Sequence, residues 1–347
     1  MSARHIGCVG WLVLVSACSS GTQGDEAAGG GGASVEPGVS SFEQHAYIGE
    51  AGTRTYKLFV PATAAGAGPL PLIVDLHGCS SDADEEARWS RFNLYAEAQT
   101  FLVVYPEQST DANGSRCWNW FLPDQQARDD AEPAIIAAIA ETIVQTQDVD
   151  PARVYITGIS AGAAMANIVA VNYPDRFAAV MIYAGCEYRG TTCTAGLAYL
   201  PAETSGELAY QAMGEHARVV PALVLQGDRD LQVPYPNADL IVGQYLASDD
   251  WADDGANNGS VSRMPARTEV GEVPDGHSYE IDTYEDSRGC VIVQRWLVHG
   301  MGHAWSQGQS NGSARDQLLT DPLGPDLTQA TIDFLLGHSL SSQTPCS

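Results

Sequence analysis

Hydrophobic positions along the chain alternate between short apolar runs rich in β-branched residues and longer stretches with helical spacing. The short runs predict strands at 56–60, 70–76, 101–105, 153–157, 179–183, 219–226 and 291–298. Helical spacing predicts helices over 134–144, 163–171 and 326–336. Strands that alternate with helices indicate an α/β fold, with a mostly parallel central sheet covered by helices on both faces.

Two stretches lack either pattern. Residues 186–214 are irregular, and residues 251–276 are polar and rich in turn-forming residues. Sheets of this class place their sites beyond the carboxyl ends of the strands. We therefore expect both stretches to be loops over that edge of the sheet.

The amino-terminal segment has the composition of an export signal. Residues 1–18 contain Arg4, an apolar run over 6–15 and small residues before Cys18. The segment 15–18, Val-Ser-Ala-Cys, resembles a bacterial lipobox, which predicts lipidation of Cys18; ordinary cleavage and free secretion is the alternative. Residues 19–41, rich in Gly and Ser, predict a flexible linker, and we expect 42–347 to form a single domain.

Charge and cysteine content indicate which ligands the protein does not bind and how its cysteines are used. The formal net charge is −26, with 17 basic and 43 acidic residues, which argues against binding nucleic acid or anionic lipid. We expect membrane contact only through a lipid on Cys18. No Cys-x-x-Cys pair appears, so we expect no metal site and interpret six of the eight cysteines as three disulfides of an exported protein. These six are Cys79, Cys117, Cys186, Cys193, Cys290 and Cys346.

The strongest chemical signal is the segment 158–162, Gly-Ile-Ser-Ala-Gly, which lies between a predicted strand and a predicted helix. A tight strand-to-helix turn needs Gly at its flanks and exposes the Ser hydroxyl above the sheet. The sequence therefore predicts Ser160 as a nucleophile. A chance match to the motif is the alternative.

A Ser hydroxyl needs a base and an orienting acid, which follow in the order Ser, acid, His in such folds. His303 lies in a Gly-rich loop after the strand 291–298 and is the predicted base; His299 is its rival, and His277 is interpreted as structural. Asp230 is the predicted acid, because it lies farther into the loop after the strand 219–226 than its competitor Asp228.

Two further groups of residues are expected around the nucleophile. Backbone N–H groups of Ala161 and Cys79 are the predicted oxyanion donors, since one follows the nucleophile and the other follows an early strand. An ordinary turn at 77–78 is the alternative. Aromatic walls suit an apolar or ring-bearing acyl group. The predicted substrate-binding residues are His77, Trp118, Trp120 and Trp305, although packing of the loops would equally explain the Trp residues.

From about residue 53 to 337 the sequence resembles the polyhydroxybutyrate depolymerase family of esterases, which includes feruloyl and acetylxylan esterases. The resemblance rests on the segments 76–79, 104–108, 117–121, 158–162, 227–234, 302–305 and 320–326. It implies the α/β-hydrolase fold and a triad of Ser160, Asp230 and His303, and it places Asp230 rather than Asp228 as the acid. Two departures, Ala163 and the segment 306–308, stand where the family usually has Gly residues.

We interpret the protein as a monomeric serine carboxylic ester hydrolase that forms an acyl-enzyme and needs no cofactor or metal. Short-acyl or aromatic esters and hydroxyalkanoate oligomers are the expected substrates, with plant cell-wall feruloyl or acetyl esters as the alternative. A catalytically inactive surface lipoprotein is the alternative from another class. The expected disulfides are Cys79–Cys117, between the oxyanion and Trp loops, Cys186–Cys193, a short local loop, and Cys290–Cys346.

Overall fold

The computed structural model of the chain describes residues 38–191, 193 and 199–340. The chain divides into two units, and the first of them, Met1–Ala33, lies outside the described residues, as does Cys18. The second unit, Ser34–Ser347, contains a ten-stranded sheet and a two-stranded one. The ten strands are β1 (Ser41–Gly49), β2 (Gly52–Val60), β3 (Leu70–Leu76), β4 (Leu102–Pro106), β5 (Val149–Gly158), β6 (Val180–Tyr183), β7 (Ala222–Gly227), β8 (Arg267–Glu272), β9 (Ser278–Glu285) and β10 (Val291–Val298). The small sheet pairs β11 (Trp305–Ser306) with β12 (Thr320–Asp321).

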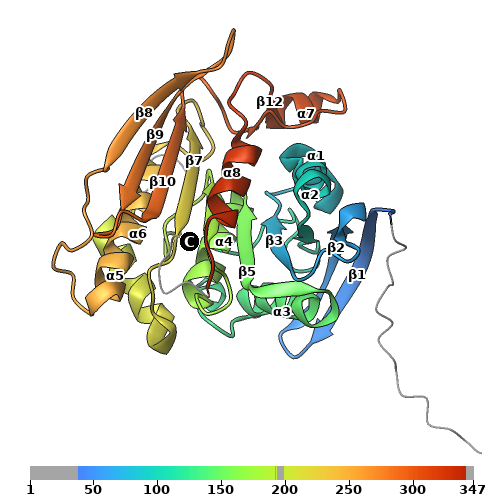
Figure 1. The fold of residues 1–347 in the computed structure, drawn as a ribbon, viewed down its shortest axis with the longest axis horizontal. Helices are drawn as coiled ribbons and strands as arrows, with labels where there is room; N and C mark the ends of the chain where they lie inside the picture. The colour runs from blue at the N-terminus through green and yellow to red at the C-terminus, as the bar shows by residue number, and fades with distance from the viewer. Residues whose placement is uncertain (1–37, 192, 194–198, 341–347) are drawn as a thin grey trace, which may run out of the picture. The chain divides into compact units, whose positions relative to one another are not determined.

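The large sheet has the strand order β1-β2-β4-β3-β5-β6-β7-β10-β9-β8. Figure 1 shows β1 and β8 at its two ends. The six strands from β4 to β10 in this order are parallel, and two antiparallel strands extend each edge. All seven predicted strands are present. The predicted mostly parallel sheet is therefore confirmed at its centre, and the antiparallel edge strands β1, β8 and β9 are additions.

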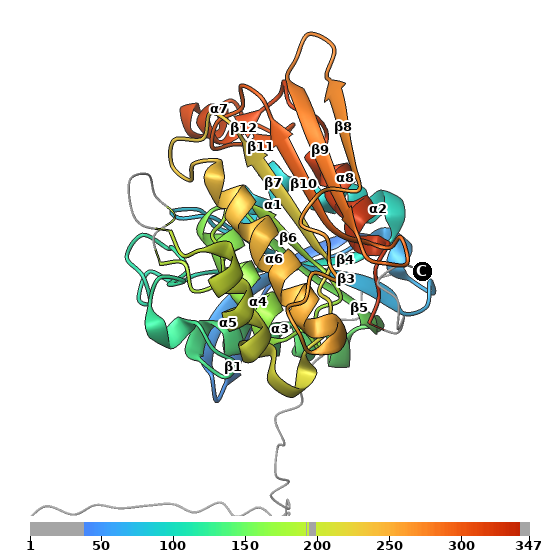
Figure 2. The ribbon, with the colours of Figure 1, turned by 90° about the vertical axis from the view of Figure 1, so that its left-hand side faces the viewer.

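Helices cover both faces of this sheet. Figure 2 shows α3 to α6 in front of the sheet, while α1, α2 and α8 pack with the opposite core. Because both faces are covered, β3 is buried throughout and its residues alternate between the two cores, with Leu72 and Val74 in one and Ile73 in the other. The helices are α1 (Ala83–Ser90), α2 (Phe92–Gln99), α3 (Ala131–Thr146), α4 (Ala161–Asn172), α5 (Ala202–Met213), α6 (Pro236–Asp254), α7 (Ala314–Leu319) and α8 (Leu327–Leu336). Within the described ranges, no helix combines the length and apolar composition that crossing a membrane requires.

The prediction of two long loops was wrong. The stretch 186–214 contains α5, and the stretch 251–276 contains the end of α6 and the strand β8. The buried face of α5 consists largely of small residues, and a Cβ at Gly206 would lie 2.4 Å from the Cβ of Ala247 on α6. The apolar signal of α5 is weak for that reason. The residues of β8 are almost all exposed at the sheet edge, so this strand lacks a hydrophobic face.

The register of the central strands brings four loops to one edge of the sheet. Leu76 at the end of β3 pairs with Gly158 at the end of β5. Gly227 at the end of β7 pairs with Val298 at the end of β10. Since the parallel strands point the same way, the segments that follow them lie together at their carboxyl ends.

Candidate active site

Ser160 occupies a strained turn between β5 and α4. Its φ of 58° and ψ of −122° are unfavourable for a residue with a Cβ. The backbone around it is tightly packed: a Cβ at Gly158 would lie 2.6 Å from the carbonyl carbon of Gly162, and one at Gly162 would lie 2.0 Å from the oxygen of Leu76. Only Gly therefore fits at both flanks, as the sequence predicted.

The buried Asp230 pairs with His303, whose side chain is 9% exposed. The Asp230 Oδ2 lies 2.6 Å from His303 Nδ1, and its Oδ1 accepts hydrogen bonds from the backbone N–H groups of Gln232 and Val233, both at 2.8 Å. The Gln226 side chain donates a longer bond, 3.3 Å, to Oδ2. Asp230 is 4% exposed. Four donors hold this carboxylate, so its position and the orientation of the imidazole are well defined.

The rival residues form a second Asp–His pair in the same two loops. Asp228 Oδ2 lies 3.1 Å from His299 Nδ1, and Asp228 Oδ1 accepts a hydrogen bond of 2.7 Å from the Gly300 N–H. His299 Nε2 is 3.5 Å from Glu280, and Arg229 Nε is 3.9 Å from Asp228. Both side chains of the pair are partly exposed. The second imidazole is thus paired with carboxylates on both ring nitrogens.

The pocket beside the Ser160 hydroxyl also contains His303 but not His299. It has a volume of about 70 Å³. It is bordered by residues from several loops, including Cys79, Ser160, Gln232, His303, Trp305 and Leu319. The first pair, and not the second, therefore opens on the predicted nucleophile.

Two backbone donors accompany the nucleophile. Ala161 begins α4, where the first N–H groups have no acceptor within the helix. Cys79 lies in the loop after β3, and a Cβ at the neighbouring Gly78 would be 3.4 Å from the Ser160 Cβ. Among the described residues, neither the Ala161 nor the Cys79 N–H donates to a protein acceptor. Both amides remain available to a developing oxyanion.

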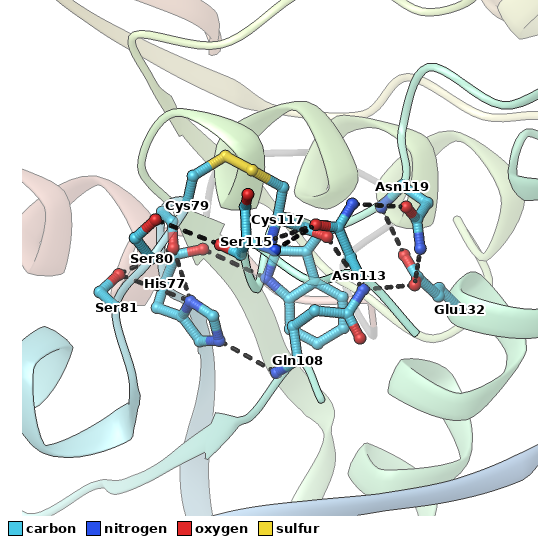
Figure 3. The surroundings of a disulfide bond; sticks show 12 residues. His77, Cys79, Ser80, Ser81, Gln108, Asn113, Ser115, Cys117, Asn119 and Glu132 are labelled. Atoms are coloured by element: carbon cyan, nitrogen blue, oxygen red, sulfur yellow. Dashed lines mark hydrogen bonds between the residues drawn. A yellow bond between two sulfur atoms is a disulfide. The ribbon is translucent and has the colours of Figure 1, made fainter. Parts of the chain in front are cut away.

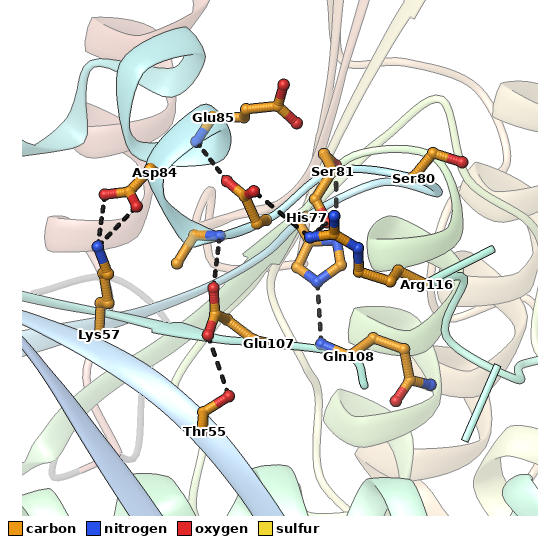
Figure 4. Close-up of polar contacts among 12 residues, drawn as sticks. Thr55, Lys57, His77, Ser80, Ser81, Asp84, Glu85, Glu107, Gln108 and Arg116 are labelled. Carbon is orange, nitrogen blue, oxygen red and sulfur yellow. Dashed lines mark hydrogen bonds and ion pairs between the residues drawn. The ribbon is translucent and has the colours of Figure 1, made fainter. Parts of the chain in front are cut away.

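A disulfide joins the loop after β3, which contains Cys79, to the Trp-containing segment 117–121, as predicted. Cys79 pairs with Cys117, and Figure 3 shows the hydrogen bonds around this bond. On the other side of the loop, Asp82 caps α1 by accepting a 3.0 Å bond from the Glu85 N–H, and Arg116 contacts Asp82 at 3.4 Å (Figure 4). The loop that carries one candidate oxyanion donor is therefore held at both ends.

The interpretation of His77 as a substrate-binding residue is corrected by its burial. Its Nε2 accepts a 3.0 Å hydrogen bond from the Gln108 N–H, so the ring proton lies on Nδ1, which donates to the Gly78 oxygen at 2.7 Å (Figures 3 and 4). His77 is 1% exposed, and this burial lowers the pKa of the imidazole to about 4. The side chain supports the turn before Cys79 and does not border the pocket beside Ser160.

The Trp residues differ in position. Trp118 is fully buried and its Nε1–H donates to the His77 oxygen at 3.2 Å, so its predicted role in substrate binding is also corrected. Trp120 packs edge-to-face on Phe121 and does not border the pocket beside Ser160. Trp305 does border it, and its Nε1–H donates to Thr328 Oγ1 at 3.0 Å. Of the four predicted substrate-binding residues, only Trp305 lies at the pocket.

Other residues that shape the site were not predicted from the sequence. The Tyr183 hydroxyl donates to the Ala304 oxygen at 2.7 Å and accepts from the Ser306 N–H at 3.2 Å, which fixes the loop containing His303. Trp89 and Leu319 border the pocket from α1 and α7. Their contributions depend on segments distant in sequence, and the only hint was the apolar character of these residues.

The remaining cysteines agree with export as far as the structure describes them. Cys186 pairs with Cys193, as predicted. Cys290 is buried, whereas Cys346 lies outside the described residues, so the third pairing stays a prediction. Disulfides persist outside the reducing cytoplasm, and the chain is therefore an exported protein.

The parallel sheet, the Ser turn after β5 and the Asp and His loops after β7 and β10 define an α/β-hydrolase fold. Residues 54–269 match the family described as "Esterase PHB depolymerase", and the chain belongs to this family.

Similar proteins include poly(3-hydroxyalkanoate) depolymerase C of Paucimonas lemoignei, which is 30% identical over 244 residues, 67% of this chain and 54% of the relative. Acetylxylan esterase A of Emericella nidulans is 31% identical over 131 residues, 38% of this chain and 41% of the relative. The chain thus spans about half the length of these relatives. The structure of an acetyl xylan esterase from Aspergillus awamori superimposes with a TM-score of 0.60 at 18% identity, covering 79% of this chain and 97% of that one, and shows the same fold.

Proposed function

We propose that the protein is a serine carboxylic ester hydrolase in which Ser160 is the nucleophile, His303 the base and Asp230 the orienting acid. The observation that carries this proposal is the 2.6 Å Asp230–His303 contact at a pocket that also contains Ser160 on its strained turn. Nucleophile, base and acid follow in the chain order usual for this fold. The family assignment supports the same reaction class.

The geometry supplies each step of acyl transfer. His303 donates its Nδ1 proton to Asp230, so Nε2 is free to accept the Ser160 hydroxyl proton as the oxygen attacks the ester carbonyl. The N–H groups of Cys79 and Ala161 stabilise the resulting oxyanion. The tetrahedral intermediate then expels the alcohol, which takes the proton from His303. Water repeats these steps on the acyl-enzyme and releases the acid.

The small pocket beside Ser160 favours short acyl groups. Its volume of about 70 Å³ and its walls of Trp89, Trp305 and Leu319 suit a compact apolar chain. The resemblance to a poly(3-hydroxyalkanoate) depolymerase supports hydroxyalkanoate oligomers as substrates. Similarity to an acetylxylan esterase favours acetyl esters of plant cell walls as the second candidate.

The export signal and the lipobox-like segment 15–18 support a proposal for the location of the protein. The proposed enzyme is attached to the cell envelope by a lipid on Cys18, works as a monomer and meets soluble esters. A Cys18→Ser variant should move from the detergent phase to the aqueous phase in Triton X-114 partitioning. Unchanged partitioning of this variant would contradict the anchor and leave the esterase proposal intact.

Fluorophosphonate labelling and ester hydrolysis test the reaction. The probe should label Ser160, and Ser160→Ala should lower kcat by about 10⁶-fold, as for triad serines elsewhere. The exposed Ser310 offers a matched control, because Ser310→Ala should keep both labelling and activity. Labelling at another residue would refute the proposed nucleophile.

The acyl preference can be measured by comparing hydrolysis rates on p-nitrophenyl acetate, butyrate and octanoate, methyl ferulate and 3-hydroxybutyrate oligomers. We expect acetate, butyrate and the shortest oligomer, the dimer, to be hydrolysed fastest, because octanoate and longer acyl groups exceed the small pocket. A strong preference for methyl ferulate would instead support a feruloyl esterase.

A further inference from the structure

A second, larger space adjoins the pocket beside Ser160. It is an open groove of about 640 Å³. The groove and the pocket share Gln232, His303 and Leu319, so the two spaces meet at the imidazole. An ester has an acyl part and an alcohol part on the two sides of the attacked carbonyl. The meeting of two spaces at His303 offers a separate place for each part.

The positions of the nucleophile, the oxyanion donor and the base assign the alcohol part of the ester to the groove. The small pocket is bordered by Ser160 and Cys79, the nucleophile and one oxyanion donor, so the acyl carbon belongs there. His303 must hand its proton to the leaving oxygen, which therefore lies on the imidazole side. The groove is on that side and does not border Ser160.

The lining of the groove combines apolar residues with positive charge. Leu231 and Leu318 are 88% and 77% exposed, which is unusual for large apolar side chains so close to one another. Arg229 and Arg315 also line the groove, and no Asp or Glu does. In a chain with 43 acidic and 17 basic residues, such a lining favours a ligand that is apolar along its length and carries a negative charge.

Of the two cations, Arg229 is the one that can reach a ligand. Arg315 is engaged by Glu85 at 3.1 Å and by the Ser80 oxygen at 2.8 Å. The Arg229 side chain is 78% exposed, and its ion pair with Asp228 is long, 3.9 Å. Both oxygens of Asp228 already have closer partners, described above. The guanidinium can therefore turn toward the groove at little cost.

We infer that the groove binds the alcohol part of the ester and that Arg229 recognises a carboxylate on it. The inference rests on the proposed function. In a 3-hydroxyalkanoate dimer with a free carboxyl end, the second unit is such an alcohol, a short apolar chain that ends in a carboxylate, and the first unit is an acyl group short enough for the small pocket. The enzyme would thus cleave the ester bond nearest the carboxyl end. Acyl transfer to Ser160 breaks this bond, the proton from His303 passes to the leaving oxygen, and one hydroxy acid leaves through the groove.

Two substrates that share the internal ester bond and differ in the charge at the end of the alcohol part test this assignment. The dimer of 3-hydroxybutyrate and its methyl ester present the same scissile bond, but only the free acid carries the carboxylate. Wild-type protein should have a kcat/KM about 5-fold higher for the acid, the scale of an exposed ion pair, mainly through a lower KM. Arg229→Gln should bring the two substrates to the same kcat/KM, and Arg229→Glu should invert the preference.

The control variant is Arg267→Gln, which removes another partly exposed Arg on β8, away from both spaces. It should keep the wild-type preference. Salt at 0.5 M should reduce the preference of the wild type, because exposed charges are screened. An acid-to-methyl-ester ratio that is the same in wild type and Arg229→Gln would overturn the inference. Failure of the wild type to hydrolyse p-nitrophenyl butyrate would instead refute the proposed function.

Discussion

Two Asp–His pairs lie side by side in the loops after β7 and β10, yet they differ in environment. The Asp230–His303 pair has side chains that are only 0% and 9% exposed, has a 2.6 Å contact and opens on the pocket with Ser160. The Asp228–His299 pair is partly exposed, has a 3.1 Å contact and does not border that pocket. The residue types are the same, so type alone does not determine the role.

Hydrogen bonding explains the difference. The Asp230 carboxylate accepts two backbone N–H bonds besides the imidazole, and His303 keeps Nε2 for the nucleophile. His299 has a carboxylate near each ring nitrogen, since Glu280 lies 3.5 Å from Nε2. A base must have a free nitrogen within reach of the proton that it accepts. Only the first pair meets this requirement.

Removing each imidazole in turn should give the largest difference in activity between the two pairs. His303→Ala should lower kcat by about 10⁶-fold, the loss seen when a triad His is removed. His299→Ala should keep kcat close to the wild-type value, because this ring does not border the pocket. Steady-state rates on p-nitrophenyl butyrate measure both. If His299→Ala were the more damaging change, the assignment of the base would be wrong.

The carboxylates should differ in the same direction with a smaller effect. Asp230→Asn should lower kcat by about 10⁴-fold, because an amide does not hold the imidazole in the productive tautomer. Asp228→Asn is the matched control and should keep most of the activity. Circular dichroism of both variants shows whether the fold is retained. Equal losses in the two variants would remove the distinction between the pairs.

A third histidine, His77, differs from both His303 and His299 because no carboxylate in the part of the chain that the structure describes is hydrogen-bonded to its ring. His77 Nε2 accepts from the Gln108 N–H, so a second ring proton would remove this bond. Burial lowers the pKa of His77 to about 4, and the unfolded chain therefore binds more protons below pH 6.5. Stability should fall as pH decreases from about 6.5 to about 4, by about 3 kcal/mol from this residue.

Urea unfolding at pH 7 and pH 4 measures this loss, and His77→Gln should show a smaller pH dependence than the wild type. NMR titration of the imidazole provides a test that does not depend on the variant folding. The ring should remain neutral down to about pH 5. Protonation near pH 6.5 in the folded protein would contradict the role of His77 as a neutral support of the Cys79 turn.

Local patterns were sufficient for the elements that have a clear hydrophobic period. The strand β3 is buried throughout, β5 is buried in its second half and β10 is at least partly buried along its length. The turn at Ser160 needs Gly158 and Gly162 whatever the rest of the chain does. The same patterns failed for α5 and β8, because one buries small residues and the other buries almost nothing. A period of apolar residues predicts an element only where that element buries a large apolar face.

The sequence by itself determined the parallel sheet, the nucleophile turn and the loops in which the acid and the base lie, because these depend on residues adjacent in the chain. Only the tertiary structure decided that His77 and Trp118 are buried supports and that Trp305 borders the pocket. It also brought Leu231 of the acid loop beside Leu318 of α7 and placed Arg229 at their groove. Burial and the surroundings of a charge depend on segments distant in sequence, and no local pattern records which segments meet.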